Sequence, residues 1–516
     1  MKKRILSCFM ALALCLTLLP ATALAAPAHQ THPICGKTCS HTGQGGTEHP
    51  DNAFENAKWM ASYDGNLSVG SPKGGTYGKT LTGDPTDDNC VLLGTGYYYL
   101  STTADGCNHD YVASSKTIKI DGNVTICLNG KQIQKVGNTT GSVFEVPAGN
   151  TLTLTDCTGN GQIIRDSSFS NGSGVYVNGG TLNLYSGQIT KSTGQQGTVS
   201  NKNNYGGGVY VNNGGTFNMY GGFITGNSAN YGGGVYVKSG TFNMYGGTIK
   251  ENTSSEGYGS GFGGAGVYVE ASGNFIMNND ASVTGNKATG YGATLNGGGV
   301  FVNGGTFTMN DNASVTGNKA KNGTLNGGGV YVSGNGTFTM NNSASITGNT
   351  ATDNGGGVYV NGGTFNMNDG AIRGNTATNN GGGVYVYSGT FNMNGSASVT
   401  GNTATNNKST DTTYGGGVYV NGGTFTMNGE ATSVSNNTAT GNGGGVYVTD
   451  TGTFTMNSST ASVTDNKADQ GGGVYASVGT FTMRGGSITG NKNNGVFVHE
   501  TATFTVSGAP TVMGNT

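Results

Sequence analysis

The chain has 516 residues, of which 98 are glycine, and only 10 % of its residues are charged. Its 24 basic and 26 acidic side chains give a formal net charge of −2, which excludes the strongly basic surface typical of proteins that bind nucleic acid or anionic membranes. Glycine at this level indicates disorder unless it recurs with a period, so the repeat pattern decides the fold class.

Residues 1–25 have the pattern of a secretory signal peptide. A basic segment at residues 2–4 precedes an apolar run at residues 5–19, and the small residues at 23–25 suit cleavage. The apolar run is too short to be a stable membrane anchor. We therefore expect a secreted, extracellular protein with no membrane span, whose cell-wall association would depend on a region outside this chain. Cleavage removes three of the 24 basic residues and none of the 26 acidic ones, which leaves a net charge of −5.

Residues 26–88 show no repeat and are predicted to be an irregular N-terminal segment with closely spaced cysteine and histidine. His32, Cys35, Cys39 and His41 could together hold Zn²⁺, whose usual protein ligands include thiolates and imidazoles. Their spacing matches no standard zinc site, so a flexible leader or a Cys35–Cys39 disulfide is the alternative. We expect no cofactor.

Residues 89–170 are predicted to form an N-terminal cap and the opening coils of a repeat structure. Apolar and polar residues alternate at 117–120 and again at 151–157, as they do in strands with one buried face. Cys127 and Cys157 are 30 residues apart, which is one repeat length. The two side chains would therefore stack in neighbouring coils, either as buried thiols or as a disulfide in an oxidising compartment.

Residues 171–516 repeat a Val-Tyr-Val motif in twelve copies at steps of 22 to 34 residues. In each copy two further alternating segments follow, such as residues 306–309 and 315–318, and glycine-rich turns separate them. Three short strands per copy cannot bury their apolar faces alone, so the copies are predicted to stack as coils. The motif begins at Val175, Val209, Val235, Val267, Val300, Val330, Val358, Val384, Val418, Val446, Val474 and Val496.

Two apolar rows and one asparagine row recur in register along the repeats. Phe occurs at 217, 242, 275, 307, 338, 365, 391, 425, 454, 481 and 504, and Met follows two residues later in all but the last copy. Asn closes eleven of the twelve copies, at 227, 252, 286, 318, 349, 375, 402, 437, 466, 491 and 515. We expect Phe and Met to point inward. We expect Asn to follow a left-handed corner residue, usually Gly, and to hydrogen-bond from coil to coil.

These observations predict an all-β fold, a single-stranded right-handed parallel β-helix with three short strands per coil. The pattern Gly-Gly-Gly-Val-Tyr-Val, Thr-Phe-Thr-Met and Ile-Thr-Gly-Asn resembles the repeats of bacterial pectin-lyase-like β-helix surface proteins and adhesins. The resemblance covers residues 171–516 and, more loosely, residues 90–170. It implies the fold, but the family includes lyases, hydrolases and adhesins, so it does not imply one activity.

Three function classes remain open. We favour a non-enzymatic, adhesin-like surface protein that presents a repetitive face to glycans or host surface molecules. The resemblance implies that a polysaccharide lyase or hydrolase would need clustered carboxylates and a base. Asp369 and Arg373 lie in one coil, but adjacent coils offer no matching acids, so we assign no catalytic residue. Ice binding is the third class, because six coils carry an outward Thr-x-Thr pair, beginning at Thr306, Thr337, Thr424, Thr453, Thr480 and Thr503.

The middle residue of each Val-Tyr-Val motif points outward if both valines face the core. One hypothesis is that exposed phenol faces, represented by Tyr359, Tyr385 and Tyr419, hold the sugar rings of a glycan. The alternative, which we favour, is a stacking ladder that stiffens the sheet.

Overall fold

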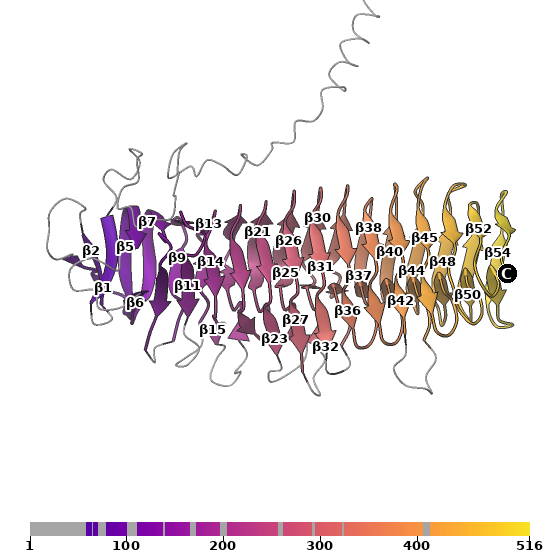
Figure 1. Cartoon of the computed structure of the whole chain (residues 1–516), viewed down its shortest axis with the longest axis horizontal. Helices are drawn as coiled ribbons and strands as arrows, with labels where there is room; N and C mark the ends of the chain where they lie inside the picture. The colour runs from indigo at the N-terminus through magenta and orange to yellow at the C-terminus, as the bar shows by residue number, and fades with distance from the viewer. Residues whose placement is uncertain are drawn as a thin grey trace, which may run out of the picture. The chain divides into compact units, whose positions relative to one another are not determined.

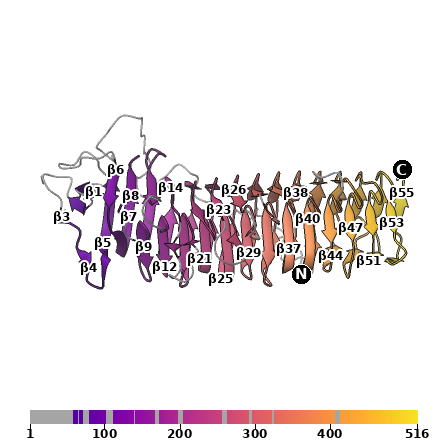
Figure 2. The same ribbon diagram turned by 90° about the horizontal axis from the view of Figure 1, so that it is seen from below.

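The tandem repeats form short strands that pair with the strands of the next coil. The computed structural model describes residues 58–63, 66–70, 79–100, 111–137, 140–165, 172–193, 195–196, 204–255, 262–290, 295–321, 323, 325–405 and 413–516. Figures 1 and 2 show the coils following one another in chain order, from the β1 end to the β55 end. The described residues contain strands and turns and no helix, as the all-β prediction requires.

Two strand columns carry the Val-Tyr-Val and Phe-x-Met motifs, and they belong to one large sheet in which corresponding residues of successive coils are paired in parallel. Four strands of the regular repeats run through both columns: β21 (Val235–Met244), β25 (Val267–Met277), β37 (Val358–Met367) and β40 (Val384–Met393). The first column also contains β9 (Phe144–Pro147), β12 (Val175–Asn178), β17 (Val209–Asn212), β29 (Val300–Asn303), β33 (Val330–Ser333), β43 (Val418–Val420), β47 (Val446–Val448), β50 (Val474–Ala476) and β53 (Val496–Val498). The second column also contains β10 (Thr151–Thr155), β13 (Thr181–Leu184), β18 (Gly215–Met219), β30 (Thr306–Met309), β34 (Thr337–Met340), β44 (Thr424–Met427), β48 (Thr453–Met456), β51 (Thr480–Met483) and β54 (Thr503–Val506).

The third column forms a separate 15-stranded parallel sheet, which confirms three strands per coil. It contains β6 (Tyr111–Ser114), β8 (Gln132–Lys135), β11 (Gln162–Arg165), β14 (Gln188–Thr190), β19 (Phe223–Thr225), β22 (Thr248–Lys250), β26 (Ser282–Thr284), β31 (Ser314–Thr316), β35 (Ser345–Thr347), β38 (Ala371–Arg373), β41 (Ser398–Thr400), β45 (Ser433–Ser435), β49 (Ser462–Thr464), β52 (Ser487–Thr489) and β55 (Thr511–Met513).

A fourth, shorter column follows the asparagine corner in eight coils and was not expected from the sequence. It contains β20 (Ser228–Ala229), β23 (Thr253–Ser255), β27 (Lys287–Thr289), β32 (Lys319–Lys321), β36 (Thr350–Ala351), β39 (Thr376–Ala377), β42 (Thr403–Ala404) and β46 (Thr438–Ala439). Two small pairs lie between the repeats: β15 (Gln195–Gln196) with β16 (Asn204–Tyr205), and β24 (Phe262–Gly263) with β28 (Leu295–Asn296).

The apolar rows fill the interior as predicted. The Phe and Met side chains from Phe217 to Met483 are fully buried in one continuous core together with the valines of the first column. Consecutive Phe rings stack with their centroids 4.5 to 4.9 Å apart, which matches the ordinary spacing of about 4.8 Å between paired strands. Each coil therefore completes the core of its neighbours.

The asparagine corner is a buried hydrogen-bonded ladder, which confirms the expected coil-to-coil bonding. In one step of this buried asparagine ladder, the backbone N–H and the side-chain Nδ2 of Asn349 both donate to Asn375 Oδ1, at 2.9 and 3.0 Å. Asn349 Nδ2 also donates to the Val315 carbonyl at 3.0 Å. Because Asn349 Oδ1 accepts two bonds from Asn318, both amide hydrogens and both lone pairs of the oxygen are used.

Glycine serves two different purposes beside this corner. Gly348 precedes the corner Asn with a φ of +64°, and a Cβ there would meet nothing within 4 Å, so only the left-handed backbone favours glycine. Asn436 and Asp465 hold the same corner position at φ values of 55° and 56°. Gly356 is the reverse case, since a Cβ there would lie 2.5 Å from the Gly382 carbonyl oxygen. The second and third glycines of the triplet are therefore required by the close approach of the next coil, since a Cβ at Gly357 would likewise lie 2.6 Å from the Gly383 carbonyl oxygen.

An antiparallel cap precedes the parallel coils. β1 (Lys58–Tyr63) pairs with β2 (Asn66–Gly70), β2 pairs with β3 (Lys79–Thr80), and β4 (Gly83–Asp84) pairs with β5 (Asp87–Leu100). β5 then runs parallel to β7 (Thr117–Cys127), the first full coil strand. Strands β1 to β4 thus fall within residues 26–88, where the absence of a repeat had suggested irregular structure.

Candidate functional site

The tyrosines of the Val-Tyr-Val motif lie outside the central core in a row of their own, but they are not open to solvent. Tyr359, Tyr385 and Tyr419 are only 7 to 8 % exposed. The Tyr385 ring is stacked between the other two, with centroid distances of 4.8 and 4.7 Å and interplanar angles of 3° and 8°. Both faces of that ring are therefore occupied by protein, contrary to the hypothesis of exposed phenol faces. From Tyr331 to Phe497 the row is a stacking ladder, whereas the rings between Tyr210 and Tyr331 meet at tilted or edge-on angles.

Several hydroxyl groups of this row are held by the next coil. Asn303 Nδ2 donates to the Tyr268 hydroxyl at 3.0 Å, and Asn361 Nδ2 donates to the Tyr331 hydroxyl at 3.2 Å. Burial raises the pKa of Tyr331 above its ordinary value. These phenols therefore stay protonated at physiological pH and act as structural groups.

A different outward column carries side chains with spare binding capacity. It is formed by the residue that directly follows each second-column strand. The first three members are Tyr185, Tyr220 and Tyr245, which are half-buried and stack at 4.6 and 5.2 Å. The next seven, which we call the amide row, are Asn278, Asn310, Asn341, Asn368, Asn394, Asn428 and Asn457.

The amide row is linked from side chain to side chain. Each Nδ2 donates to Oδ1 of the preceding member at distances of 2.7 to 3.4 Å. Arg484 ends the row by donating from Nη1 to Asn457 Oδ1 at 2.9 Å. Because an amide has two N–H donors and two oxygen lone pairs, each interior member keeps one of each for a ligand. A Met-Asn pair in seven consecutive copies marks this row in the sequence, although it was not singled out there.

A shallow depression lies beside two members of the amide row. Its lining comes from the turns of neighbouring coils: Asn394, Gly395, Ser396, Asn428, Gly429, Glu430 and Ala431. The amide row therefore offers regularly spaced amide donors and acceptors along the coil axis, and a surface hollow lies beside it. This arrangement suits hydrogen bonding to a hydroxyl-rich ligand.

Residues 338–509 match the family model described as a right-handed beta helix region. The repeat region is a right-handed β-helix. The resemblance to β-helix repeat proteins is thereby confirmed. No curated protein and no solved structure matches the chain significantly. Among the described residues of the β-helix, no helix is long and apolar enough to cross a membrane.

Asp369 and Arg373 of the β-helix are each bound within the repeat structure. Asp369 Oδ1 accepts the Ser396 N–H at 2.8 Å, and Arg373 Nε donates to Thr347 Oγ1 at 3.4 Å. Over the part of the chain that the structure describes, no group of three His, Cys, Asp or Glu side chains could hold a metal ion. His32, Cys35, Cys39 and His41 lie outside the described residues. The Zn²⁺ hypothesis for them stays a prediction.

The two coil cysteines of the β-helix lie side by side, as their one-coil spacing predicted. The Sγ atoms of Cys127 and Cys157 are 2.9 Å apart. Cys127 is fully buried and Cys157 partly so.

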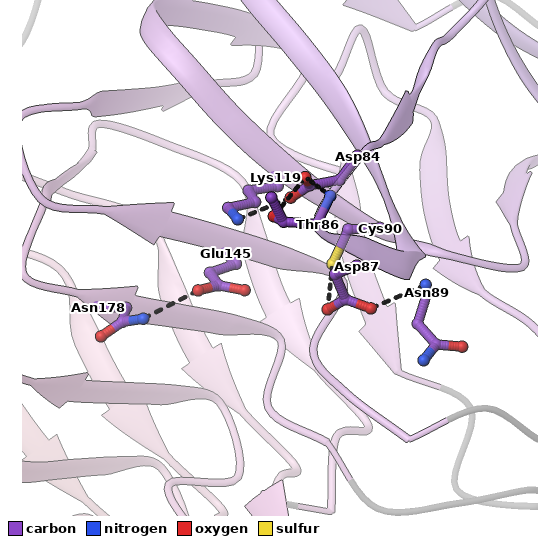
Figure 3. Close-up of polar contacts among 8 residues, drawn as sticks. All are labelled: Asp84, Thr86, Asp87, Asn89, Cys90, Lys119, Glu145 and Asn178. Carbon is purple, nitrogen blue, oxygen red and sulfur yellow. Dashed lines mark hydrogen bonds and ion pairs between the residues drawn. The ribbon is translucent and has the colours of Figure 1, made fainter.

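The N-terminal end of the first column carries charged residues in place of tyrosine (Figure 3). Lys119 and Glu145 pair in register, and Glu145 pairs in turn with Tyr176. Lys119 Nζ donates to Asp84 Oδ2 at 2.7 Å, which ties the cap strand β4 to the first coil. Cys90 Sγ donates to Asp87 at 3.2 Å, and burial raises the Cys90 pKa to about 12. The thiol therefore stays protonated and is a poor nucleophile.

The Lys119–Asp84 contact gives a pH prediction for the cap. The hydrogen bond from Lys119 is the largest cause that lowers the pKa of Asp84 from 3.8 to about 2. A carboxyl whose pKa is lower in the folded state stabilises the fold above the unfolded pKa, and this stabilisation is lost as the pH falls through the folded pKa. We expect Asp84→Asn to melt below wild type at pH 6 and the gap to close between about pH 4 and pH 2. Thermal melts of both proteins check this, with Asp88→Asn as the exposed control. A gap that is unchanged at pH 2 would contradict the assignment.

Proposed function

We propose that this protein is a secreted or cell-surface, non-enzymatic β-helix that acts in adhesion by binding glycans along the amide row. The carrying observation is the run of seven half-buried or exposed amides, one per coil, each with an unused donor and acceptor. One coil advances the row by about 4.8 Å, a length comparable to one sugar in an extended chain. A polymer of hydroxyl-bearing rings lying along the axis could therefore meet the same contact repeatedly, and repeated weak contacts add up to useful avidity. The signal-peptide pattern of residues 1–25 supports an extracellular location.

A glycan array with matched variants tests this proposal. Asn368→Ser with Asn394→Ser removes two adjacent amides of the row, and Ser507 shows that serine is accepted at this position. Asn303→Ser with Asn361→Ser is the control on the first column, where Ser333 and Ser388 occupy the same position. We expect the first pair to weaken binding of a neutral glycan by about tenfold, since each lost hydrogen bond costs about 1 kcal/mol. Equal binding by both variants, or no neutral glycan bound by wild type, would refute the proposal.

Ice binding is a second candidate that a specific observation supports. Thr424 and Thr426 of β44 pair in register with Thr453 and Thr455 of β48. The two rows continue through β51 and β54, so eight threonine side chains form a regular array over four coils. A thermal-hysteresis assay separates this candidate from adhesion, because a glycan-binding protein does not depress the freezing point without changing the melting point.

A further inference from the structure

Four lysines gather on three consecutive coils at the edge between the third and fourth columns. Lys250 ends β22, Lys287 begins β27, and Lys319 and Lys321 are the two ends of β32. Lys287 and Lys319 are direct partners in parallel register, and Lys321 is opposite Thr289. Strands β27 and β32 are labelled side by side along one edge in Figure 1. We call these four residues the lysine patch.

The lysine patch is a local concentration of positive charge on a chain with net negative charge. Lys287 and Lys319 are exposed, and register pairing places their backbones about 4.8 Å apart. Like charges directly opposite each other destabilise a sheet. Within the described residues the one ion pair is Lys119–Asp84, so no carboxylate there is paired with the patch. Glu251, which follows Lys250 and is its nearest acid in the sequence, forms no ion pair with any described lysine.

A second lysine pair in the same repeat position has two acidic residues close to it in the sequence. Lys467 and Lys492 are bridge partners in successive coils, but Asp465 and Asp469 flank Lys467. The fourth-column position therefore carries two lysine pairs. Counting acids within two residues in the sequence leaves the patch at +3, from four Lys and Glu251, and the second pair at 0, from two Lys with Asp465 and Asp469. The two sites form a natural comparison within one molecule.

The surroundings of the lysine patch suit a sugar polymer with negative charges. Phe223 is 37 % exposed, and Lys250 Nζ lies 5.0 Å from its ring centroid, so an aromatic surface adjoins the charge. The neighbouring third-column strands present half-buried hydroxyls, including Ser282 and Ser314, which are bonded to each other at 3.2 Å. Ammonium groups act as point charges that do not demand a bidentate partner, so either carboxylate or sulfate groups fit.

We infer that the lysine patch is a binding site for an acidic polysaccharide that lies along the coil axis. The inference rests on the proposed function in one respect only, that the protein meets glycans outside the cell. The site is distinct from the amide row, because it lies on the far side of the third column. Charge-dependent binding would then take place at the lysine patch, and hydrogen bonding to neutral sugars at the amide row.

Binding of defined polyanions tests the inference. Polygalacturonate supplies carboxylates, dextran sulfate supplies sulfates, and uncharged dextran is the blank. The test variant is Lys287→Thr, Lys319→Thr and Lys321→Thr, since threonine occupies these positions in other coils, as at Thr350 and Thr289. The control variant is Lys467→Thr and Lys492→Thr, since Thr438 holds the same position one coil before Lys467. We expect the test variant to bind polyanion at least about tenfold more weakly, the control to change by less than about twofold, and wild-type binding to fall as salt rises.

Each other outcome overturns the inference. Unchanged binding by the test variant, equal losses in test and control variants, or no polyanion binding by wild type would show that the patch is not the site. Tighter binding of duplex DNA than of either polyanion would make nucleic acid the partner instead. The Asn368→Ser, Asn394→Ser protein should keep full polyanion binding. If it binds polyanion more weakly, the amide row takes part in that binding and the lysine patch is not a separate site. If wild type binds polyanions and no neutral glycan, the amide-row proposal fails while this inference stands.

Discussion

Phe365→Asp is expected to destabilise the repeat region by more than about 5 kcal/mol, because it removes a large buried ring and places a charge in an apolar column. The Phe365 ring is fully buried, with the rings of Phe338 and Phe391 stacked on either side at 4.6 and 4.7 Å. No cation lies in that row to pair with the new carboxylate. Thermal or denaturant unfolding followed by circular dichroism measures the loss.

Two further variants separate charge from size and inside from outside. Phe365→Leu should cost only about 1–2 kcal/mol, since Leu182 already occupies this row in register with Phe217. Thr316→Asp should change stability by less than about 1 kcal/mol, since Thr316 is an outward residue in the middle of the third column. If Phe365→Asp and Thr316→Asp melt alike, the inside and outside faces have been exchanged.

Local alternation and repeat period were enough to predict the interior of this protein. A strand with one buried face places every second residue inward, so the Phe and Met rows followed once the copies were aligned. The asparagine corner was also predictable, because the residue before it is almost always Gly, Asn or Asp, the types that tolerate a left-handed backbone. Glu251 adopts the same conformation at φ +56°, so the repeat geometry overrides the residue's preference there.

Burial on the outer side of a strand was not predictable in the same way. Alternation tells which side of the strand Tyr385 occupies, but its low exposure comes from Tyr359 and Tyr419 in the adjacent coils. The antiparallel cap was missed because β1 and β2 have no copy elsewhere in the chain to reveal them. The fourth column escaped notice because two-residue strands such as Thr350–Ala351 are too short to show alternation.

Asn375→Ala is the second variant with a large expected effect, and the reason is the completeness of the buried asparagine ladder. Asn375 Oδ1 accepts both the backbone N–H and the Nδ2 of Asn349, and Asn375 Nδ2 donates to Asn402 Oδ1 and to the Ile346 carbonyl, each at 3.0 Å. Asn349, Asn375 and Asn402 are all fully buried, so water cannot replace a lost partner. Alanine would leave two buried donors of Asn349 without an acceptor.

Each buried polar group left unsatisfied costs about 1–3 kcal/mol, so Asn375→Ala should destabilise the repeat region by about 4 kcal/mol. Asn366→Ala in the same coil is the matched control. Asn366 also bonds to a stacked asparagine, Asn392, at 2.9 Å, but its side chain reaches solvent, so its loss should cost less than about 1 kcal/mol.

Denaturant unfolding of the two variants compares their free energies of unfolding directly. Hydrogen exchange should show the loss of protection concentrated in the coils that adjoin Asn375, because solenoid coils contact mainly their neighbours. If the two variants lose the same free energy of unfolding, the buried hydrogen bonds of the asparagine ladder add no more stability than the solvent-accessible ones. The stability of the coil would then have to come from the apolar rows alone.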